Sequence, residues 1–530
     1  MSVRLRKEIQ KMLRRLKKLF QRAKALCVKG EAIGFIVSAV LLSLSFSSFG
    51  LEYLAWCAFL PFFLALKNTT TPKAFFLSYA SGIVFWLSTI YWVAHVTAAG
   101  MLILVSYLAL YFALFGLCVS FALRRGGIFC LFYIPGLWVI LEYARSHLFS
   151  GFPWALLAYS QYKHILLIQC ADVAGAWGIS FIVMLVNAAL YLLFENRLAA
   201  WGKLKLVLAV FLLLSAVGVY GVKKVMAHRS PAHTPSQSIV VALIQGNIPQ
   251  ELKWDARSET FILNKYFRIT DEAAKEKPDL LIWPEAAVPF ILGEEPGYLE
   301  YLKEYMQELK LPLLLGAVTS RNGAYYNSAL LMQPDGSVRY QYDKLHLVPF
   351  GEYVPLRRVF PFLNTIVPIG DFHSGREYTV FELLLEKKAA PIAFSVLICF
   401  EDLFPQLSRE FVRRGAQFLV NITNDGWFQK TQAPYQHLQA SVFRAVENHV
   451  YVLRAANTGI TAFINPCGEV FSLVRDAGGE LTFIDGFDQK AFTPGVNSGT
   501  FYTRHGDVLI LICAGLVLLG TFKYFGKRGI

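Results

Sequence analysis

The chain has 530 residues, too many for one ordinary domain, and 55% of them are hydrophobic, which exceeds the share usual in soluble proteins. The formal net charge is +14, and much of the excess lies in the first thirty residues. Length and composition exclude a single soluble domain and predict several membrane spans beside a soluble part.

Residues 1–30 form a basic arm in which apolar side chains recur at helical spacing between lysines and arginines. This pattern predicts an amphipathic helix on an anionic membrane surface, with a disordered basic tail as the alternative. The basic stretch is too long, and a small-residue cleavage site is lacking, for a secretory signal peptide. Nucleic acid is the rival partner for such charge, but no nucleic-acid motif accompanies it, so we expect none to bind.

Eight apolar runs after the arm predict a helical membrane bundle. Seven fall within 31–224 and the eighth within 506–530, where a basic tail follows. Most approach the roughly 17–25 residues that cross a bilayer as a helix, and the second is slightly short. The runs lie near 32–48, 52–67, 74–96, 100–123, 127–148, 172–194, 203–222 and 507–524.

The charges of the connecting loops predict the orientation of these spans. Basic loops stay on the cytoplasmic side, and the loops Gly50–Leu51 and Thr97–Gly100 hold no lysine or arginine. With the amino terminus inside, seven spans place 225–505 on the outer face, and the eighth returns the chain to the cytoplasm. The basic residues of the inner loops and tail are Lys67, Lys73, Arg124, Arg125, Arg197, Lys203, Lys205, Lys523, Lys527 and Arg528.

One predicted span carries charge. Trp138, Glu142 and Arg145 are spaced so that their side chains share a helix face. Charged groups near a span are costly unless they are paired or hydrated, which makes Glu142 and Arg145 candidate substrate-binding residues. A structural ion pair at the membrane interface is the alternative interpretation.

A polar linker near 225–238 precedes a segment in which strand-like and helix-like runs alternate. The first strand-like run begins at Ile239 and the last ends near Leu473. The alternation predicts a layered α/β domain, and residues 225–505 are numerous enough to bury a core of their own.

Three reactive side chains follow strand-like runs of this domain, namely Glu285, Lys344 and Cys399. Ligands gather at the strand ends of α/β sheets. A free thiol is a poor nucleophile near neutral pH until a base takes its proton, which a neighbouring glutamate can do. A lysine beside both can stabilise an oxyanion. We therefore predict a Glu–Lys–Cys catalytic site with Cys399 as the nucleophile.

The chain has eight cysteines without CxxC or metal-type spacing, so the sequence predicts neither a disulfide framework nor a metal site. Five cysteines lie in or beside the apolar runs, and only Cys399 and Cys467 lie in the α/β part. We expect both to be free thiols, because a bridge would block the nucleophile. His346 and His437 could be considered for a Cys–His dyad, and a structural role is favoured for both.

Three segments around the catalytic candidates carry a family resemblance, namely Trp283-Pro284-Glu285, the run YDKLHLVPFGEYVP at 342–355, and Cys399-Phe400-Glu401. They resemble the glutamate, lysine and cysteine boxes of the carbon–nitrogen hydrolase (nitrilase) superfamily. With seven spans before the domain and one after it, the chain resembles the membrane branch, the apolipoprotein N-acyltransferase family. Further matching segments are 245–250 with Trp254, 421–428 and 454–459.

The resemblance implies a membrane α-helical bundle of about eight spans plus an α/β nitrilase-like αββα sandwich. It also implies two-step acyl transfer without a cofactor. Cys399, deprotonated by Glu285, would attack a phospholipid ester, typically at the sn-1 chain of phosphatidylethanolamine. Lys344 and the Phe400 backbone N–H would hold the oxyanion. The thioester would then acylate the α-amino group of the diacylglyceryl-cysteine of a lipoprotein.

The same resemblance implies a monomer in a bacterial inner membrane, with the catalytic domain in the periplasm. By the same matching, Glu352 and Glu401 resemble supporting carboxylates, and Trp254 and Asn327 resemble substrate-binding residues. Satisfied hydrogen-bonding or packing roles are the alternatives for Glu352, Glu401 and Trp254. The chain departs from the family pattern at Phe400, where tyrosine is common, so any role of that hydroxyl is lost.

Two other functions fit parts of the sequence. A membrane-tethered amidase or nitrilase would form the same acyl-enzyme and use water as the acceptor. A transporter-like or scaffold protein would use the α/β domain only for binding, although few charges lie deep in the spans.

Overall fold

A computed structural model describes residues 31–195, 198–229, 238–253, 255–294, 296–353, 372–385, 388, 390–495 and 499–525. Several residues named above lie outside this part of the chain. They are the basic arm 1–30, Arg197, Trp254, Val354–Pro355 and the tail residues Lys527 and Arg528.

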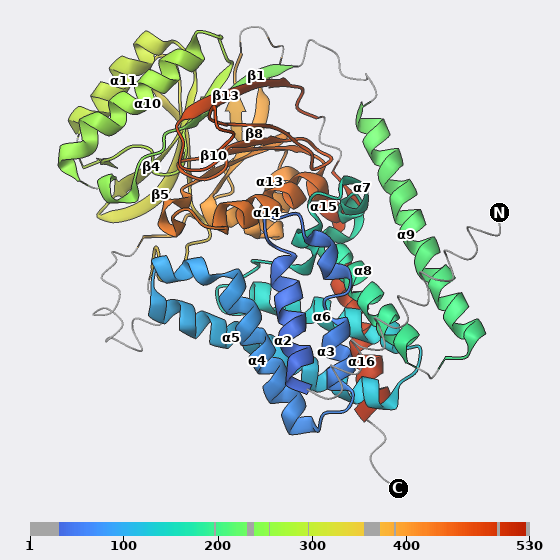
Figure 1. Cartoon of the computed structure of the whole chain (residues 1–530). Helices are drawn as coiled ribbons and strands as arrows, with labels where there is room; N and C mark the ends of the chain where they lie inside the picture. The colour runs from blue at the N-terminus through green and yellow to red at the C-terminus, as the bar shows by residue number, and fades with distance from the viewer. Residues whose placement is uncertain are drawn as a thin grey trace.

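The first part of the chain and its last helix form a helical body beneath two sheets (Figure 1). Buried aromatic rings fill its centre, where Trp138 packs edge-on against Phe59 and Phe115. Helices that are apolar on all faces need either such a core or lipid around them. The helices are α2 (Glu31–Leu44), α3 (Leu60–Leu66), α4 (Thr71–Thr89), α5 (Ala98–Arg125), α6 (Cys130–His147), α7 (Ile165–Ile168), α8 (Ala171–Phe194), α9 (Ala200–Arg229), α15 (Phe501–His505) and α16 (Val508–Phe525).

Helical structure occurs at each predicted apolar run, but the lengths differ from the prediction. Among the described residues, α5, α8 and α9 are long and apolar enough to cross a membrane, and the apolar helices α2 and α16 are shorter. The run 52–67 divides into a 3-10 turn at Glu52–Trp56 and the short helix α3, and the run 74–96 leaves the α-helix after Thr89. A membrane part is supported, whereas the number of eight spans stays a prediction.

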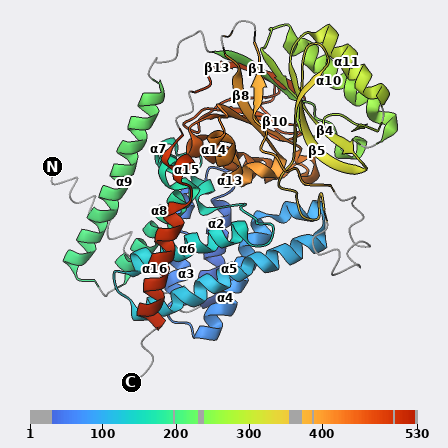
Figure 2. The same ribbon diagram turned by 180° about the vertical axis from the view of Figure 1, so that it is seen from behind.

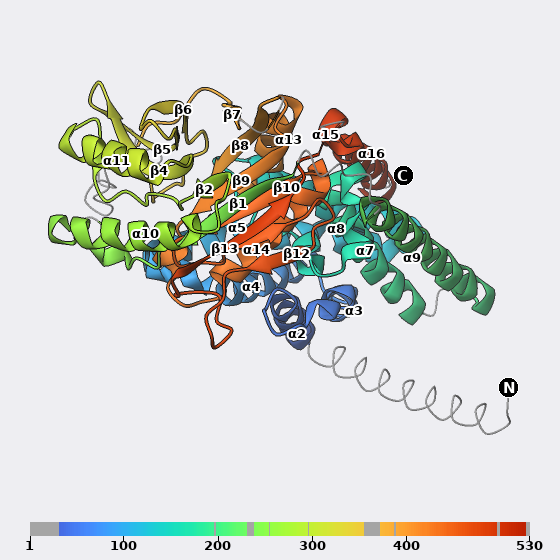
Figure 3. The ribbon, with the colours of Figure 1, turned by 90° about the horizontal axis from the view of Figure 1, so that it is seen from above.

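Helix α9 lies to one side of the other helices in all three views (Figures 1–3). It continues to Arg229, past the predicted start of the linker at 225. Lys224 and Tyr220 of α9 both contact Asp172 of α8, through an ion pair of 2.6 Å and a hydrogen bond of 2.8 Å. These polar contacts hold α9 near α8, while its apolar side chains such as Phe211 and Leu212 are exposed.

The segment from Ile239 to Phe492 folds into two β-sheets. In the described part of the chain the first sheet has seven strands in the order β13-β1-β2-β4-β5-β6, with β3 beside β4, and the second has six in the order β12-β11-β10-β9-β8-β7. The strands are β1 (Ile239–Gln245), β2 (Leu280–Ile282), β3 (Ile291–Leu292), β4 (Leu313–Arg321), β5 (Ala324–Met332), β6 (Val338–Asp343), β7 (Phe381–Leu383), β8 (Ile392–Ile398), β9 (Phe418–Thr423), β10 (Tyr451–Ala456), β11 (Ala462–Ile464), β12 (Val470–Leu473) and β13 (Gly486–Phe492).

Parallel pairing brings the functional ends of the strands together. Strand β1 runs parallel to β2, with Val241 opposite Leu280, and β8 runs parallel to β9, with Ile398 opposite Ile422. Since parallel strands end at the same edge, the residues that follow them become neighbours.

The two sheets stack face to face between two helical layers (Figures 1 and 3). Helices α10 (Glu259–Ala274) and α11 (Pro296–Leu309) cover the first sheet, and α13 (Pro405–Arg413) and α14 (Ala433–Asn448) cover the second. Strands buried on both faces read as nearly continuous apolar runs, as β8 does. The αββα sandwich predicted from the sequence is confirmed.

Helix α14 also faces the helical body, so it is buried on nearly all sides. The side chain of Gln436 joins the two parts. Its Oε1 accepts hydrogen bonds from Trp92 Nε1 at 3.1 Å and Trp154 Nε1 at 2.7 Å, and its Nε2 donates to Thr89 O at 3.0 Å. The two-sheet domain is therefore hydrogen-bonded directly to the end of α4 and to the segments that follow α4 and α6.

Candidate active site

The three predicted catalytic residues lie just past the ends of strands. Glu285 follows β2, Lys344 follows β6, and Cys399 follows β8. Cys399 opens a 3-10 turn, Cys399–Leu403, that leads into α13. Its φ is +54°, a left-handed conformation that costs energy for a residue with a side chain. Such backbone strain at a reactive side chain is typical of functional sites.

The carboxylate of Glu285 is held from two sides. Its Oε1 accepts a hydrogen bond from Asn327 Nδ2 at 2.8 Å, and its Oε2 accepts one from the Asn424 backbone N–H at 2.9 Å. The residue is only 7% exposed. A carboxylate fixed in this way can take a proton from a neighbouring group without first being reoriented.

Lys344 lies between two carboxylates. Its Nζ is 3.0 Å from Glu352 Oε1 and 3.5 Å from Glu285 Oε1. Burial alone would lower the pKa of Lys344, but Glu352 and Glu285 raise it above its ordinary value. The lysine is therefore a permanent cation at neutral pH, as a group that stabilises an oxyanion must be.

Asn327 bridges the same two carboxylates. Its Nδ2 donates to Glu285 Oε1 and to Glu352 Oε1, at 2.8 Å each, which fixes the orientation of the amide. Its Oδ1 is buried and has no hydrogen-bond partner among the described residues. A buried acceptor without a partner is costly unless a ligand satisfies it, so this oxygen is available to a substrate N–H or O–H.

The charges of Glu285 and Lys344 both act on the Cys399 thiol. Burial raises the pKa of Cys399 most, the Glu285 carboxylate raises it further, and the Lys344 ammonium lowers it. The resting sulfur is therefore a protonated thiol, with an acceptor for its proton and a cation that stabilises the thiolate close by. Cys399 is half-buried, and both it and Cys467 are free, as expected.

Glu401 fastens the cysteine turn to the segment that carries Lys344. Its fully buried carboxylate accepts hydrogen bonds from three backbone N–H groups and one hydroxyl group. The donors are Ile398 N at 2.7 Å, Leu345 N at 2.8 Å, His346 N at 3.0 Å and Tyr342 OH at 2.9 and 3.0 Å. This side chain positions Lys344 relative to Cys399.

Glu142 and Arg145 bond a loop instead of each other; in the described part of the chain no ion pair joins them. Arg145 Nη1 donates to Phe152 O at 2.6 Å and to Trp154 O at 2.7 Å. Glu142 Oε1 accepts from Leu157 N at 2.7 Å. Both residues therefore brace the loop that follows α6.

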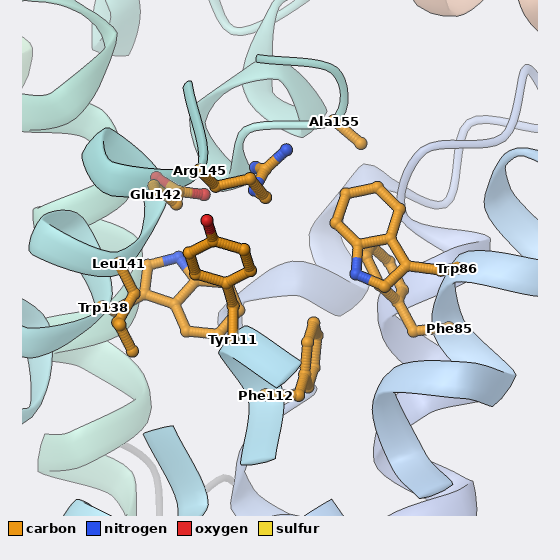
Figure 4. Close-up of a pocket in the computed structure, with 9 residues that line it drawn as sticks. All are labelled: Phe85, Trp86, Tyr111, Phe112, Trp138, Leu141, Glu142, Arg145 and Ala155. Atoms are coloured by element: carbon orange, nitrogen blue, oxygen red, sulfur yellow. The ribbon is translucent and has the colours of Figure 1, made fainter. Parts of the chain in front are cut away.

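The braced loop packs on the cysteine turn. The indole of Trp154 stacks on the ring of Phe400 with centroids 6.5 Å apart. Glu142 and Arg145, which brace this loop, also line a pocket with the aromatic rings of Trp86, Tyr111 and Trp138, among others (Figure 4). Their substrate-binding role stays a prediction, but the loop connects this pocket to the neighbour of the nucleophile.

Both histidines have structural partners. The His437 ring lies between two buried carboxylates, with Nε2 2.8 Å from Asp402 Oδ1 and Nδ1 3.0 Å from Asp425 Oδ1. The His346 ring packs on Phe404 with centroids 3.8 Å apart. Asp402 belongs to the turn that Cys399 opens, so the contact of His437 with Asp402 stabilises that turn.

The structure adds two residues that the sequence analysis does not single out. Asn424 follows β9 as Cys399 follows β8, so the rule that ligands gather at strand ends could have identified it. Lys253 donates to the carbonyl oxygens of Glu285 and Ala286. It follows no strand and bonds only main-chain atoms among the described residues, so no sequence pattern marks it.

Comparison with known proteins identifies relatives over both parts of the chain. The family described as "Apolipoprotein N-acyltransferase N-terminal domain" matches residues 38–189, and "Carbon-nitrogen hydrolase" matches residues 240–485. An apolipoprotein N-acyltransferase from Geobacter metallireducens is 40% identical over 93% of this chain and 95% of its own length. One from Chlorobaculum tepidum is 30% identical over 91% of this chain and 94% of its own length.

Among solved structures, Nit3 of Saccharomyces cerevisiae, described as a member of branch 10 of the nitrilase superfamily, matches with a TM-score of 0.37 and 19% identity. The match covers 49% of this chain and 92% of that protein.

Proposed function

The chain belongs to the apolipoprotein N-acyltransferase family, and on that premise we propose that Glu285, Lys344 and Cys399 are the residues with which it N-acylates lipoproteins. It is an acyltransferase enzyme with a membrane part and a carbon–nitrogen hydrolase domain. The observation that carries the assignment of residues is the Lys344 ammonium between Glu285 and Glu352, with Cys399 under the influence of both Glu285 and Lys344.

In the first half-reaction Glu285 takes the proton of Cys399, and the thiolate attacks the ester carbonyl carbon of a phospholipid. We expect this ester to be the sn-1 ester of phosphatidylethanolamine. The oxyanion that develops is stabilised by Lys344 and the backbone N–H of Phe400. When the carbon–oxygen bond breaks, the alkoxide takes the proton back from Glu285. A lysophospholipid leaves, and a thioester remains on Cys399.

In the second half-reaction the α-amino group of the diacylglyceryl-cysteine of a lipoprotein attacks the thioester. Glu285 takes a proton from the attacking nitrogen as the carbon–nitrogen bond forms, and Cys399 leaves as the thiolate, which the same proton then neutralises. The unpartnered Oδ1 of Asn327 is suited to accept a hydrogen bond from an amine N–H. The product is an amide, and the enzyme returns to its resting state.

We further propose that this monomer is a multi-pass protein of a bacterial inner membrane. The assignment gives a surface-bound arm at 1–30, seven spans within 31–224, a periplasmic catalytic domain at 225–505, and a last span with a basic tail at 506–530. Most basic residues of the helical body support this orientation because they lie at the helix ends away from the sheets, with Lys223, Lys224 and Arg229 of α9 as a mild exception. Arg125 at the end of α5, for example, donates to Lys523 O in α16 at 3.2 Å.

The test is an assay with labelled phosphatidylethanolamine and a diacylated lipopeptide. We expect N-acylated lipopeptide, and with the phospholipid alone an acyl thioester on Cys399 that mass spectrometry detects. Cys399→Ala should lower the rate by about 10³-fold or more, because the covalent step is lost. Cys467→Ser removes the other free thiol of the domain and should leave the rate unchanged.

Two results would contradict the proposal. Release of free fatty acid without N-acylated lipopeptide would indicate a hydrolase that uses water. Full transfer activity in Cys399→Ala would exclude the thioester.

A further inference from the structure

Lys253 is a buried lysine beside the catalytic residues that the mechanism above does not use. Lys253 is 3% exposed, and its Nζ donates hydrogen bonds to Glu285 O at 3.1 Å and to Ala286 O at 2.9 Å. Among the described residues its hydrogen bonds all go to main-chain carbonyl oxygens. A buried ammonium group without a bonded carboxylate is costly, so its retention calls for a role.

The two carbonyl groups belong to the turn that presents Glu285. Ala286 has φ +45°, which is unfavourable for a residue with a side chain. The far side of the turn packs on β4, where Ala287 N donates to Gly316 O at 2.8 Å. A Cβ on Gly316 would lie 2.5 Å from Pro284 O, so the turn has no room to shift in that direction. Lys253 holds the turn on its other side.

The loop that carries Lys253 is itself fixed to the second sheet. Ile248 N donates to Asn457 Oδ1 at 2.9 Å, and Asn424 Nδ2 donates to Gln250 Oε1 at 2.7 Å. Asn424 is the residue whose backbone N–H bonds the Glu285 carboxylate. One loop therefore connects the turn of Glu285, through Lys253, to the segment that also holds the carboxylate of Glu285.

We propose that Lys253 is a positioning residue for Glu285 and a second cation, besides Lys344, that favours the Cys399 thiolate. The inference rests on the proposed function and adds a residue to it. Lys253 acts by positioning Glu285, and its positive charge favours the Cys399 thiolate. Burial lowers the pKa of Lys253 to about 8, while the charges of Glu285 and the Cys399 thiolate act in the opposite direction. Lys253 is therefore charged at neutral pH, and its hydrogen bond to Glu285 O places this charge in the site that also holds Cys399.

The test measures the rate constant for alkylation of Cys399 by iodoacetamide in the full-length protein between pH 6 and pH 10, with mass spectrometry to locate the label. Acyl-enzyme formation from phosphatidylethanolamine vesicles is measured in a single turnover. Lys253→Met should slow both steps by about tenfold or more at neutral pH, because the thiolate loses a cation and Glu285 loses its anchor. The deficit in alkylation should narrow above pH 8, where the wild-type lysine loses its own charge.

Two further variants separate the effect of the charge of Lys253 from the effect of its hydrogen bonds. Lys253→Arg keeps the charge and should recover part of the alkylation rate at neutral pH. Lys253→Gln keeps a donor without charge, and it replaces Lys253→Met if that variant fails to fold. The matched control is Lys388→Met, because Lys388 also donates to a main-chain oxygen, Ser238 O at 2.7 Å, but before the start of β1, at its end remote from the site.

The outcomes distinguish this inference from the proposed function. If Glu285→Gln slows acyl-enzyme formation and the neutral Lys253 variants match the wild type in both steps at every pH, the role of Lys253 is refuted and the catalytic assignment stands. If Glu285→Gln also leaves both steps unchanged, the assignment of Glu285 as the base fails as well.

Discussion

At the scale of single residues, the site depends on carboxylates that position other groups as much as on those that react. Glu352 Oε1 accepts from both Lys344 and Asn327, and its Oε2 accepts from Val348 N at 2.8 Å. Glu401 likewise joins the segment after Lys344 to the end of β8, because it accepts from Leu345 N, His346 N and Ile398 N. Burial raises the pKa of Glu401 to about 7, while the Ile398 N–H, Lys344 and the other donors oppose this shift. Its hydrogen bonds are the reason why so buried an acid is tolerated.

Glu401→Gln should lower both stability and activity. The amide NH₂ group cannot accept hydrogen bonds, so at least one buried backbone N–H loses its partner, at a cost of about 1–3 kcal/mol. The rate of acyl-enzyme formation should fall because Lys344 and Cys399 lose their common anchor. Thermal unfolding and the single-turnover assay measure the two effects. The control is Glu480→Gln in an exposed ion pair with Lys430, which should change neither quantity.

The buried cluster around His437 predicts how stability depends on pH. Burial and the Arg454 guanidinium, 2.7 Å from Nδ1, lower the pKa of His437, but Asp402 and Asp425 outweigh them and raise it above 6.5. A folded-state pKa that is raised means that the protonated ring stabilises the native state. This contribution is complete below pH about 6.5 and is lost as the pH rises through the higher folded value.

The midpoint of thermal unfolding should therefore fall as the pH is raised from 6 to 9, and the fall should be smaller in His437→Gln. His505→Gln changes an exposed histidine and should follow the wild-type curve. A wild-type midpoint that rises over this range, with His437→Gln parallel to it, would show that the ring is neutral in the native protein.

At the scale of elements, α14 is the helix that joins the two-sheet domain to the helical body. It lies on the second sheet and also against α8, and all of its residues but Tyr435 are buried (Figure 2). Some of its polar side chains, such as Gln436, form hydrogen bonds that cross between the two parts. Glu447 Oε1, for example, accepts from Ala176 N in α8 at 2.8 Å. A helix with this many buried polar groups is stable only between two partners.

Gln436→Leu should loosen this junction. It leaves the indole N–H groups of Trp92 and Trp154 and the carbonyl of Thr89 without partners, at about 1–3 kcal/mol for each buried group. Hydrogen exchange should rise in the loop after α6, and acylation should slow. The matched control is Gln439→Leu on the same helix, because Gln439 Oε1 has no partner in the described part of the chain. Equal effects of the two changes would refute a special role for Gln436.

The elements that the sequence predicts best are those buried on both faces. The sequence predicts strands at Pro391–Ile398 and Gln417–Ile422 and a helix at 433–448, and β8, β9 and α14 agree with these bounds within one residue. Continuous apolar runs and helical spacing are strong signals. Strand β13 is absent from the prediction, since Gly486–Phe492 is polar and only half-buried at the edge of its sheet. The run 74–96 predicts one span, but the α-helix ends at Thr89, a position set by bonds to α14 that no local pattern records.

For the site, the strand-end rule identifies Glu285, Lys344 and Cys399, and the family resemblance adds Glu352, Glu401 and Asn327. The sequence does not reveal that Glu142 and Arg145 bond a loop, because their acceptors and donor are main-chain atoms. Lys253 is hidden for the same reason. Residues that recognise backbone atoms leave no partner residue in the sequence to be found.

At the scale of the whole molecule, most basic residues of the helical body lie at the end away from the carbon–nitrogen hydrolase domain, and the exceptions include Lys223, Lys224 and Arg229 at the end of α9. Lys67 at the end of α3 pairs with Glu195 at 2.6 Å, and Lys523 lies beside Arg125. The segments that follow α4 and α6 and meet the domain carry aromatic residues instead, among them Trp92 and Trp154. This distribution of basic residues agrees with the positive-inside rule for membrane proteins.

The orientation can be tested with single introduced cysteines and a thiol reagent that does not cross membranes. Lys303→Cys in α11 should be labelled in spheroplasts, because the proposed topology places that surface in the periplasm. Lys73→Cys, at an exposed position of α4, should be labelled only after lysis. The unsubstituted protein supplies the background from native thiols. The reverse pattern would invert the proposed topology.

The hydrogen bonds from Arg145 to the loop after α6 have a consequence for how the lipid environment acts on the enzyme. Because Trp154 in that loop stacks on Phe400, a change in the tilt of α6 should reach the backbone beside Cys399, the proposed nucleophile. Helices adjust their tilt when the thickness of the hydrocarbon layer changes. The turnover rate should therefore pass through an optimum as the acyl length of the surrounding lipids is varied, and Arg145→Lys, which cannot hold both carbonyl groups in the same way, should flatten that optimum.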